Sequence, residues 1–301
     1  MVALPSAAAG RQSPTILPAQ RNWGPVPPQA PATETLVDVG TAKLSAWDTG
    51  GTGEAVVLIH PGTGSSAIWG YQQPVLASAG YRVIAYSRRG HGKSGRGPEN
   101  DSATAVDDLT ALLDALRVER FHAVGCAAGG YVPPDFAVSN PQRLLSMTLA
   151  CTHGGVTDAQ FRQRIGAMLP RPFGDMPASF RELGPSYRAG NPDGVKEWEA
   201  LEQAARPAPA PPLKGRNPLP WSAIESIRTS ALLIAGGADL YMPVPLVLEY
   251  AAHLRDARVV IIAESGHSAY WEQPQAFNQV LLDFLKRNRG RRSRGGAGGR
   301  G

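Results

Sequence analysis

The chain has 301 residues, of which 43% are hydrophobic and 18% charged, and its formal net charge is +5. This length and composition are those of a folded protein with one large or two small domains, which excludes a wholly disordered chain. No apolar run approaches the roughly 18 residues of a membrane-spanning helix, so an integral membrane protein is excluded as well.

The positive charge is concentrated at the C-terminus. Seven of the 30 Lys and Arg residues lie within 286–301, which leaves 23 basic against 25 acidic residues in the rest of the chain. The body is therefore close to neutral, and residues 289–301 are interpreted as a basic Gly- and Arg-rich tail in solvent. We do not expect nucleic acid as a partner, although this tail is the feature that would bind it.

The sequence before residue 33 is rich in proline and alanine. It has neither the basic start nor the apolar core of a secretion signal, so residues 1–32 are predicted to be a disordered leader. The two cysteines, Cys126 and Cys151, do not make a disulfide framework. A reducing compartment, and hence a cytoplasmic location, is expected.

From Thr35 the sequence alternates short apolar runs with helical patterns. Two runs on either side of Gly40 predict a β-hairpin, and six later runs predict buried strands. Helical spacing of apolar residues predicts helices at 105–116 and 274–287. Strands that alternate with helices indicate an α/β protein with a mainly parallel sheet. The hairpin strands are Leu36–Val39 and Lys43–Trp47, and the later strands are Ala55–Ile59, Tyr81–Tyr86, Phe121–Gly125, Leu144–Ala150, Ala231–Ala235 and Arg258–Ile262.

Residues 153–222 interrupt this alternation. They contain helical patches at 158–169 and 195–205, followed by a run of prolines between Pro207 and Pro220. An insertion between two strands of an α/β sheet lies near the strand ends, where such sheets bind ligands. We therefore expect a helical cap over the binding site.

Four motifs, in order along the chain, carry a resemblance to the α/β-hydrolase family. The resemblance implies an α/β-hydrolase fold with a mainly parallel eight-stranded sheet flanked by helices. The core would comprise residues 33–152 and 223–288, on either side of the cap. The motifs are Ile59-His60-Pro61-Gly62-Thr63-Gly64, Tyr86-Ser87-Arg88-Arg89-Gly90-His91-Gly92-Lys93-Ser94, Val124-Gly125-Cys126-Ala127-Ala128-Gly129-Gly130, and the pair Gly236-Gly237-Ala238-Asp239 and Gly266-His267-Ser268.

The third motif resembles the family's nucleophile elbow, in which a G-x-S-x-G turn carries the reactive serine. The serine position here is Ala127, between Gly125 and Gly129, and alanine cannot attack a substrate. A slip of one residue would instead make Cys126 the nucleophile, with Val124 in a crowded turn that suits valine poorly. Other candidate hydroxyl groups, each more typical of a turn or a cap, belong to Ser65, Ser66 and Ser268.

One feature near the elbow departs from the family pattern, and the second motif has charged residues to explain. Pro133 and Pro134 fall where the helix after the elbow should be running, so this helix is expected to start late, kink or partly unwind. Arg88, Arg89 and His91 are expected to shape their turn rather than contact substrate.

The resemblance also implies the remaining catalytic groups. His267 occupies the position of the general base, and Asp239 that of the carboxylate that orients the base. Backbone N–H groups of Gly62 or Thr63 and of Ala128 would form an oxyanion hole. The expected substrate pocket includes Trp69, Tyr131, Tyr241 and Cys126.

The sequence contains no cluster of metal-ligand spacing and no phosphate or dinucleotide motif, so neither a metal nor a cofactor is expected. We predict an enzyme that acts on a small to medium apolar carbonyl compound such as an ester or lactone. Its dyad of His267 and Asp239 would act without a serine, unless Ala127 replaces a serine and silences a serine hydrolase. A lyase or oxygenase of the same fold and a catalytically silent ligand-binding protein stay open as alternatives, and oligomeric state is not predicted.

Overall fold

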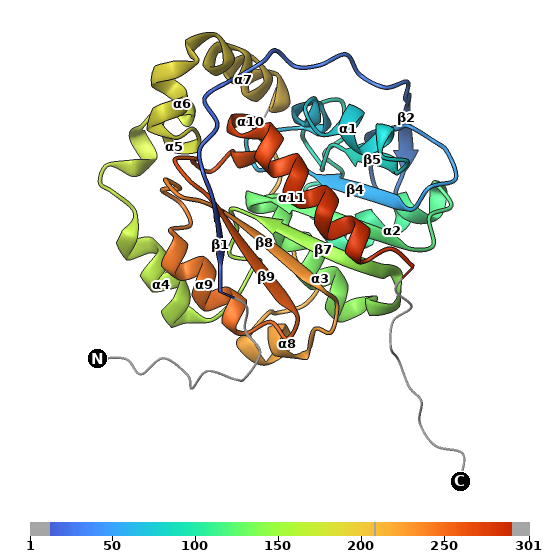
Figure 1. Ribbon diagram of the computed structural model, residues 1–301. Helices are drawn as coiled ribbons and strands as arrows, with labels where there is room; N and C mark the ends of the chain where they lie inside the picture. Colours follow the sequence, from blue (N-terminus) through green and yellow to red (C-terminus); the bar gives the residue numbers. More distant parts are fainter. Residues whose placement is uncertain (1–12, 208, 291–301) are drawn as a thin grey trace.

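The computed structural model describes residues 13–207 and 209–290. Its centre is a nine-stranded sheet with the spatial order β1-β9-β8-β7-β6-β4-β5-β3-β2 (Figure 1). Only β3 pairs with antiparallel neighbours on both sides, and the strands from β5 to β1 pair in parallel. The mainly parallel α/β fold expected from the sequence is confirmed. The strands are β1 Thr15–Leu17, β2 Thr33–Asp38, β3 Lys43–Asp48, β4 Ala55–Ile59, β5 Arg82–Tyr86, β6 Phe121–Cys126, β7 Leu144–Ala150, β8 Ala231–Gly236 and β9 Ala257–Ile262.

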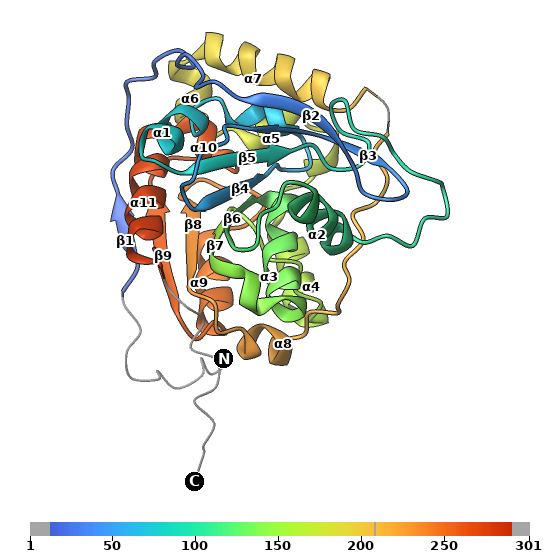
Figure 2. The same cartoon turned by 90° about the vertical axis from the view of Figure 1, so that its right-hand side faces the viewer.

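Side chains of the central strands alternate between two buried cores. In β4, Val57 and Ile59 pack in one core, whereas Val56 and Leu58 pack in the other. The first core is closed by helices α2, α3 and α9, and the second by α1 and α11 (Figure 2). Because both faces are covered, these strands are apolar without interruption, as parallel sheets require. The helices are η1 Ser66–Trp69, α1 Gln73–Ser78, α2 Ala105–Ala115, η2 Ala127–Tyr131, α3 Val132–Ser139, η3 Pro141–Arg143, α4 Ala159–Met168, η4 Phe173–Asp175, α5 Ala178–Glu182, α6 Pro185–Gly190, α7 Pro192–Ala205, α8 Trp221–Ser226, α9 Val244–Ala252, α10 Ala269–Glu272 and α11 Pro274–Arg287.

The N-terminal segment corrects two expectations. Residues 1–12 lie outside the described part of the chain, but residues 13–32 are ordered rather than a disordered leader. β1 pairs in parallel with β9, which makes the sheet nine-stranded instead of eight-stranded (Figure 1). The indole of Trp23 then packs edge-on against Tyr187 at 5.5 Å and donates a 3.0 Å hydrogen bond to the carbonyl of Glu272. These distant contacts offset the low local propensity of the segment.

The segment between β7 and β8 is mainly helical up to Ala205, as expected. It contains α4, α5, α6 and α7, and α7 ends at Ala205 before the proline run. That run is held against the core by backbone hydrogen bonds: the N–H of Gly92 donates to Ala205, and the N–H of Ala105 donates to Lys214. The inserted segment is therefore attached to the sheet at the loop that follows β5.

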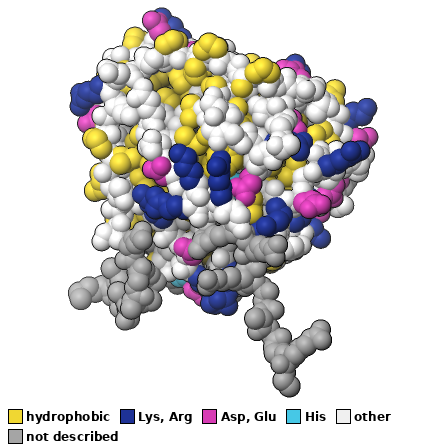
Figure 3. All heavy atoms as spheres, turned by 45° about the vertical axis from the view of Figure 1, so that its right-hand side comes forward, with side chains coloured by type: hydrophobic (Ala, Val, Ile, Leu, Met, Phe, Trp, Pro, Cys, Tyr) yellow, Lys and Arg dark blue, Asp and Glu magenta, His cyan; other side chains and the backbone are white. Residues whose placement is uncertain are grey.

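On the face shown in Figure 3, basic and acidic side chains are interspersed. At the start of the expected basic tail, the guanidinium of Arg289 lies 4.5 Å from the Tyr81 ring, and the N–H of Gly290 donates to Glu54. Residues 291–301 lie outside the described part. Within the described residues, every helix is too short or too polar to cross a membrane.

Candidate active site

The turn after β6 has the geometry of an elbow centred on Ala127. Ala127 has a φ of 49°, a left-handed value that costs free energy in a non-glycine residue. A Cβ atom on Gly125 would lie 2.5 Å from the Gly129 carbonyl oxygen, and one on Gly129 would lie 2.3 Å from the Ile59 carbonyl oxygen. Both flanking positions therefore require glycine, which fixes the register on Ala127.

Cys126, the alternative in the slipped register, is unsuited to nucleophilic attack. Its backbone is extended, and its side chain is fully buried in the second core. Burial raises the pKa of its thiol well above the ordinary value, so the reactive thiolate is disfavoured. Trp69 is also fully buried in this core. Trp69 and Cys126, which were expected to line the substrate pocket, are therefore both enclosed in the core instead.

The three candidate serines hold loops. Ser65 caps η1 by accepting a bond from the N–H of Ala67. The hydroxyl of Ser66 lies 3.0 Å from that of Ser87, and the Ser268 hydroxyl donates to Glu182 at 3.3 Å.

The prolines after the elbow lie within the first turn of α3, where a missing N–H is tolerated. A short 3₁₀ turn, Ala127–Tyr131, bridges the elbow to this helix, so the helix starts late. The structure thereby selects one of the three outcomes that the sequence left open.

His267 and Asp239 meet at the carboxyl ends of β9 and β8. Nδ1 of His267 lies 2.9 Å from each carboxylate oxygen of Asp239, and both residues are buried. Asp239 is fixed in turn, because its Oδ1 accepts hydrogen bonds from the N–H groups of Tyr241 and Met242. The Tyr241 ring lies 4.3 Å from the His267 ring. A carboxylate that is held on both sides can orient the imidazole and stabilise its charged form.

The electrostatic surroundings favour the imidazolium form of His267. Burial alone would lower the pKa of His267, but the charges of Asp239, Glu182 and Glu272 outweigh burial and raise the pKa to about 9. Glu272 accepts hydrogen bonds from the N–H groups of Gly266 and Gly184, yet burial raises its own pKa to about 8.

Glu182 and Glu272 were not singled out from the sequence. Glu182 lies on α5 of the inserted segment, and its carbonyl oxygen accepts a 2.7 Å hydrogen bond from the N–H of His267. Glu272 closes α10, directly after the Gly-His-Ser motif. The only sequence signal was that Glu272 follows His267 by little more than one helical turn.

A third group, Cys151, lies beside the dyad. It follows β7 with a φ of 49°, and its Sγ, an Asp239 oxygen and a His267 nitrogen lie within 4.8 Å of one another. This arrangement of three metal-ligand types was not expected from the spacing of the cysteines. Burial raises the pKa of the Cys151 thiol well above the ordinary value, which opposes the thiolate that a metal would need.

The loop after β4, which was expected to form the oxyanion hole, is held in place by His60. Nε2 of His60 accepts a 2.9 Å hydrogen bond from the N–H of Arg88, so the ring proton must sit on Nδ1, which donates to the Pro61 carbonyl at 2.7 Å. A Cβ atom on Gly62 would lie 3.7 Å from the Ala128 Cβ. Gly62 and Ala128, two of the three expected oxyanion residues, thus come together.

Gly62 and Ala128 both line a cavity of about 720 Å³ that extends beneath the proline run. Thr63, Tyr131, Tyr241 and the dyad are outside the described lining of this cavity. Tyr131 instead places its hydroxyl 2.8 Å from Nε2 of His153. The described lining of the cavity therefore includes Gly62 and Ala128 but not the dyad.

Comparisons with known proteins place the chain in one family. Residues 56–280 match the model of the family described as "Alpha/beta hydrolase family". A Mycobacterium tuberculosis protein named as a non-heme bromoperoxidase, BpoC, is 29% identical over 256 residues, covering 80% of this chain and 97% of that protein. A 2-hydroxy-6-oxononadienedioate/2-hydroxy-6-oxononatrienedioate hydrolase from Paraburkholderia xenovorans is 28% identical over 279 residues, covering 82% of this chain and 91% of the relative.

Among solved structures, a thermophilic esterase from Thermogutta terrifontis superposes with a TM-score of 0.70 at 23% identity, covering 86% of this chain and 99% of the esterase. At this identity the likeness shows the fold alone. The family model, however, spans the sheet from β4 to α11 together with the elbow, Asp239 and His267. The chain belongs to the alpha/beta hydrolase family and has the fold of its enzymes.

Proposed function

We propose that this protein hydrolyses an ester, a lactone or a similar carbonyl compound by activating water with His267 and Asp239, without a serine nucleophile. The observation that carries the proposal is the pair of 2.9 Å contacts between Nδ1 of His267 and the Asp239 carboxylate, beside an elbow that has a methyl group at its centre. Residues 153–222 would act as the cap. The chemistry requires neither a metal nor a cofactor.

The proposed reaction uses groups of this chain only. Nε2 of His267 removes a proton from water while the water oxygen attacks the substrate carbonyl carbon. The N–H groups of Gly62 and Ala128 stabilise the negative charge on the carbonyl oxygen. When the tetrahedral intermediate collapses, the bond to the leaving oxygen breaks and that oxygen takes its proton from the His267 imidazolium. The products are an acid and an alcohol.

A second candidate, a serine hydrolase silenced by alanine, rests on the strain at the elbow. The φ of 49° at Ala127 costs free energy that a loop without a reactive side chain does not need. Both candidates use His267 as the base and differ only in whether a serine is needed at position 127. Variants of these two positions therefore separate them.

The test measures the turnover of nitrophenyl esters and aryl lactones by the unaltered protein, His267→Ala, Ala127→Ser and Ala128→Ser. We expect slow turnover that His267→Ala abolishes. The new hydroxyl of Ala127→Ser should raise ester turnover by about 10²-fold or more, since loss of a triad serine typically costs on the order of 10⁶. Ala128→Ser, which adds a hydroxyl one residue away, should not.

Each alternative predicts a different result. Turnover that survives His267→Ala would contradict the dyad. Activity that first appears in Ala127→Ser would indicate a silenced serine hydrolase. Silence in all four proteins would favour ligand binding or chemistry other than hydrolysis.

A further inference from the structure

Arg88 is a buried cation without a counter-ion in the described structure. Only 9% of the residue is exposed, and among the described residues no carboxylate forms an ion pair with it. Its Nη2 donates to the Pro61 carbonyl at 3.2 Å, and its Nε is buried without a partner. Burial lowers the pKa of Arg88 to about 10, so the side chain stays charged at neutral pH. A buried charge without a partner is costly.

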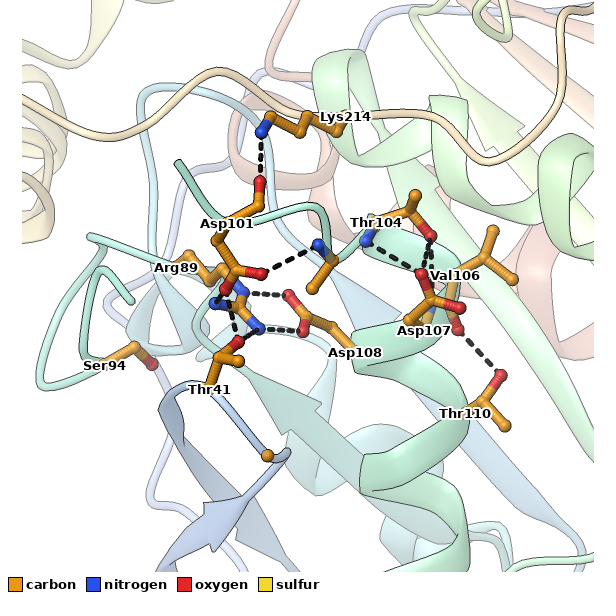
Figure 4. Close-up of polar contacts among 12 residues, drawn as sticks. Thr41, Arg89, Ser94, Asp101, Thr104, Val106, Asp107, Asp108, Thr110 and Lys214 are labelled. Carbon is orange, nitrogen blue, oxygen red and sulfur yellow. Dashed lines mark hydrogen bonds and ion pairs between the residues drawn. The ribbon is translucent and has the colours of Figure 1, made fainter. Parts of the chain in front are cut away.

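The neighbouring residue shows how the same side chain is normally satisfied. The guanidinium of Arg89 donates to both oxygens of Asp108 at 2.7 Å and to Asp101 at 2.5 Å (Figure 4). Asp101 is also fixed by Thr41 and Lys214, so this network joins the β5 loop to the proline run. Arg89 therefore shapes the turn, as expected. Among the described residues, Arg88 has no carboxylate partner of this kind to neutralise its charge.

Arg88 is one of the residues that line the cavity, together with Gly62 and Ala128. The other arginine of the described lining, Arg206, forms a 2.6 Å ion pair with Glu202. Burial, together with the charge of Arg88, lowers the pKa of His91, which leaves this ring neutral at neutral pH. Arg88 is thus the one cation of the described lining without an opposite charge. The cavity, about 720 Å³, lies in the range that small-molecule sites occupy.

We propose that Arg88 binds a carboxylate group of the substrate, so that the preferred compounds carry a carboxylate at a distance from the reacting carbonyl. A guanidinium pairs with a carboxylate through two parallel hydrogen bonds, which would supply the counter-ion that Arg88 lacks. Because Nη2 of Arg88 holds Pro61, the carboxylate would be anchored to the loop that contains Gly62. This inference rests on the proposed function for the reacting carbonyl, and it replaces the expectation of a wholly apolar substrate.

The test uses binding, so that it does not depend on turnover. Isothermal titration calorimetry compares glutaramate, which has one carboxylate and one amide, with glutaramide, in which the carboxylate is replaced by a second amide. The full-length protein should bind glutaramate at least tenfold more tightly than glutaramide, and this preference should weaken with added salt. Arg88→Gln should remove the preference, and Arg88→Lys should keep part of it, because lysine retains the charge but not the fork.

Two results would overturn the inference: equal binding of the two ligands, or a preference that survives in Arg88→Gln, whether or not Arg206→Gln removes it. Far-ultraviolet circular dichroism confirms that each variant is folded, and Arg88→Lys provides the test if Arg88→Gln is not. If glutaramate binds through Arg88 but carboxylate-bearing esters are not hydrolysed, the proposed function fails while the carboxylate site stands. If neutral and anionic esters are hydrolysed at equal rates and neither ligand is preferred in binding, the carboxylate site fails while the proposed function stands.

Discussion

The hydroxyl of Thr152 donates a 2.7 Å hydrogen bond to the carbonyl oxygen of Ala127. The loop after β7 thereby holds the strained residue of the elbow. The same hydroxyl accepts a 3.1 Å hydrogen bond from the N–H of Gly154, and a Cβ atom on Gly130 would lie 2.5 Å from Thr152 Cγ2. The elbow that contains the left-handed Ala127 is thus packed against and hydrogen-bonded to Thr152.

Thr152→Val should therefore destabilise the protein. The substitution leaves the buried Ala127 carbonyl without this donor, which costs about 1–3 kcal/mol. Thr148→Val is the matched control, because the Thr148 hydroxyl on β7 is buried without a partner and its removal should be neutral or stabilising. Urea unfolding measures both free energies. Equal values for the two variants would show that the Thr152 hydrogen bond does not hold the elbow.

The pKa of His267 sets the pH dependence of turnover. The charges of the carboxylates around His267 have a larger effect than its burial and raise its pKa to about 9. The fraction of His267 in the neutral, basic form therefore falls about tenfold for each pH unit below that value. The logarithm of kcat/KM should rise with pH, with a slope near one, up to about pH 9. A rate that is constant between about pH 6 and 8 would contradict this role.

Glu182→Gln tests the source of this pKa. Removal of a negative charge near His267 lowers the pKa of the imidazole, so the rise in kcat/KM should move to lower pH and the rate at pH 7 should increase. The side chain of Glu264, which follows β9 and is 42% exposed, provides the control. Glu264→Gln should leave the profile in place, and an equal shift in both variants would show that the effect is not specific to Glu182.

Much of the sheet is predictable because its strands are buried on both faces. β4 and β7 have the bounds that their apolar runs predict, and so does α11. Helix α2 begins at the predicted residue, one after Thr104, whose hydroxyl forms a reciprocal cap with Asp107 (Figure 4). In these elements local pattern and tertiary burial agree.

The parts that were not predicted depend on contacts between distant segments. Arg88 and Arg89 are adjacent and chemically identical, yet only one of them meets carboxylates, because the direction of each side chain is set by the fold. Glu182 is brought to His267 by the packing of α5, far along the chain from the motif. The His267 and Asp239 pair was predictable because each residue has a fixed place after its strand.

In Glu272→Gln, the free energy of unfolding should fall less steeply with rising pH than in the unaltered protein. Burial raises the pKa of Glu272 to about 8, so the folded protein keeps a proton that the unfolded chain releases above about pH 4.5. The free energy of unfolding therefore falls as pH rises between these values, by up to about 1.4 kcal/mol per pH unit for one proton.

Urea unfolding between about pH 5 and 5.5 isolates this effect. In that range His267, whose pKa is raised from 6.5, is largely protonated in both the folded and the unfolded states, so it adds little slope. The variant should have a smaller slope than the unaltered protein. Identical slopes would show that Glu272 is already ionised in the folded state.

Trp23 provides a test of the ordered N-terminal segment. Its indole packs against Tyr187 and donates to the Glu272 carbonyl, and a Cβ atom on Gly190 would lie 2.4 Å from the ring. Trp23→Ala should cost about 2–4 kcal/mol through lost packing and one lost hydrogen bond. Ile16→Ala, on β1 of the same segment, is the control: Ile16 is 67% exposed, so its truncation should change the free energy of unfolding by no more than about 0.5 kcal/mol. If the two variants unfold at the same urea concentration, the segment does not pack on α6 and α10 in solution.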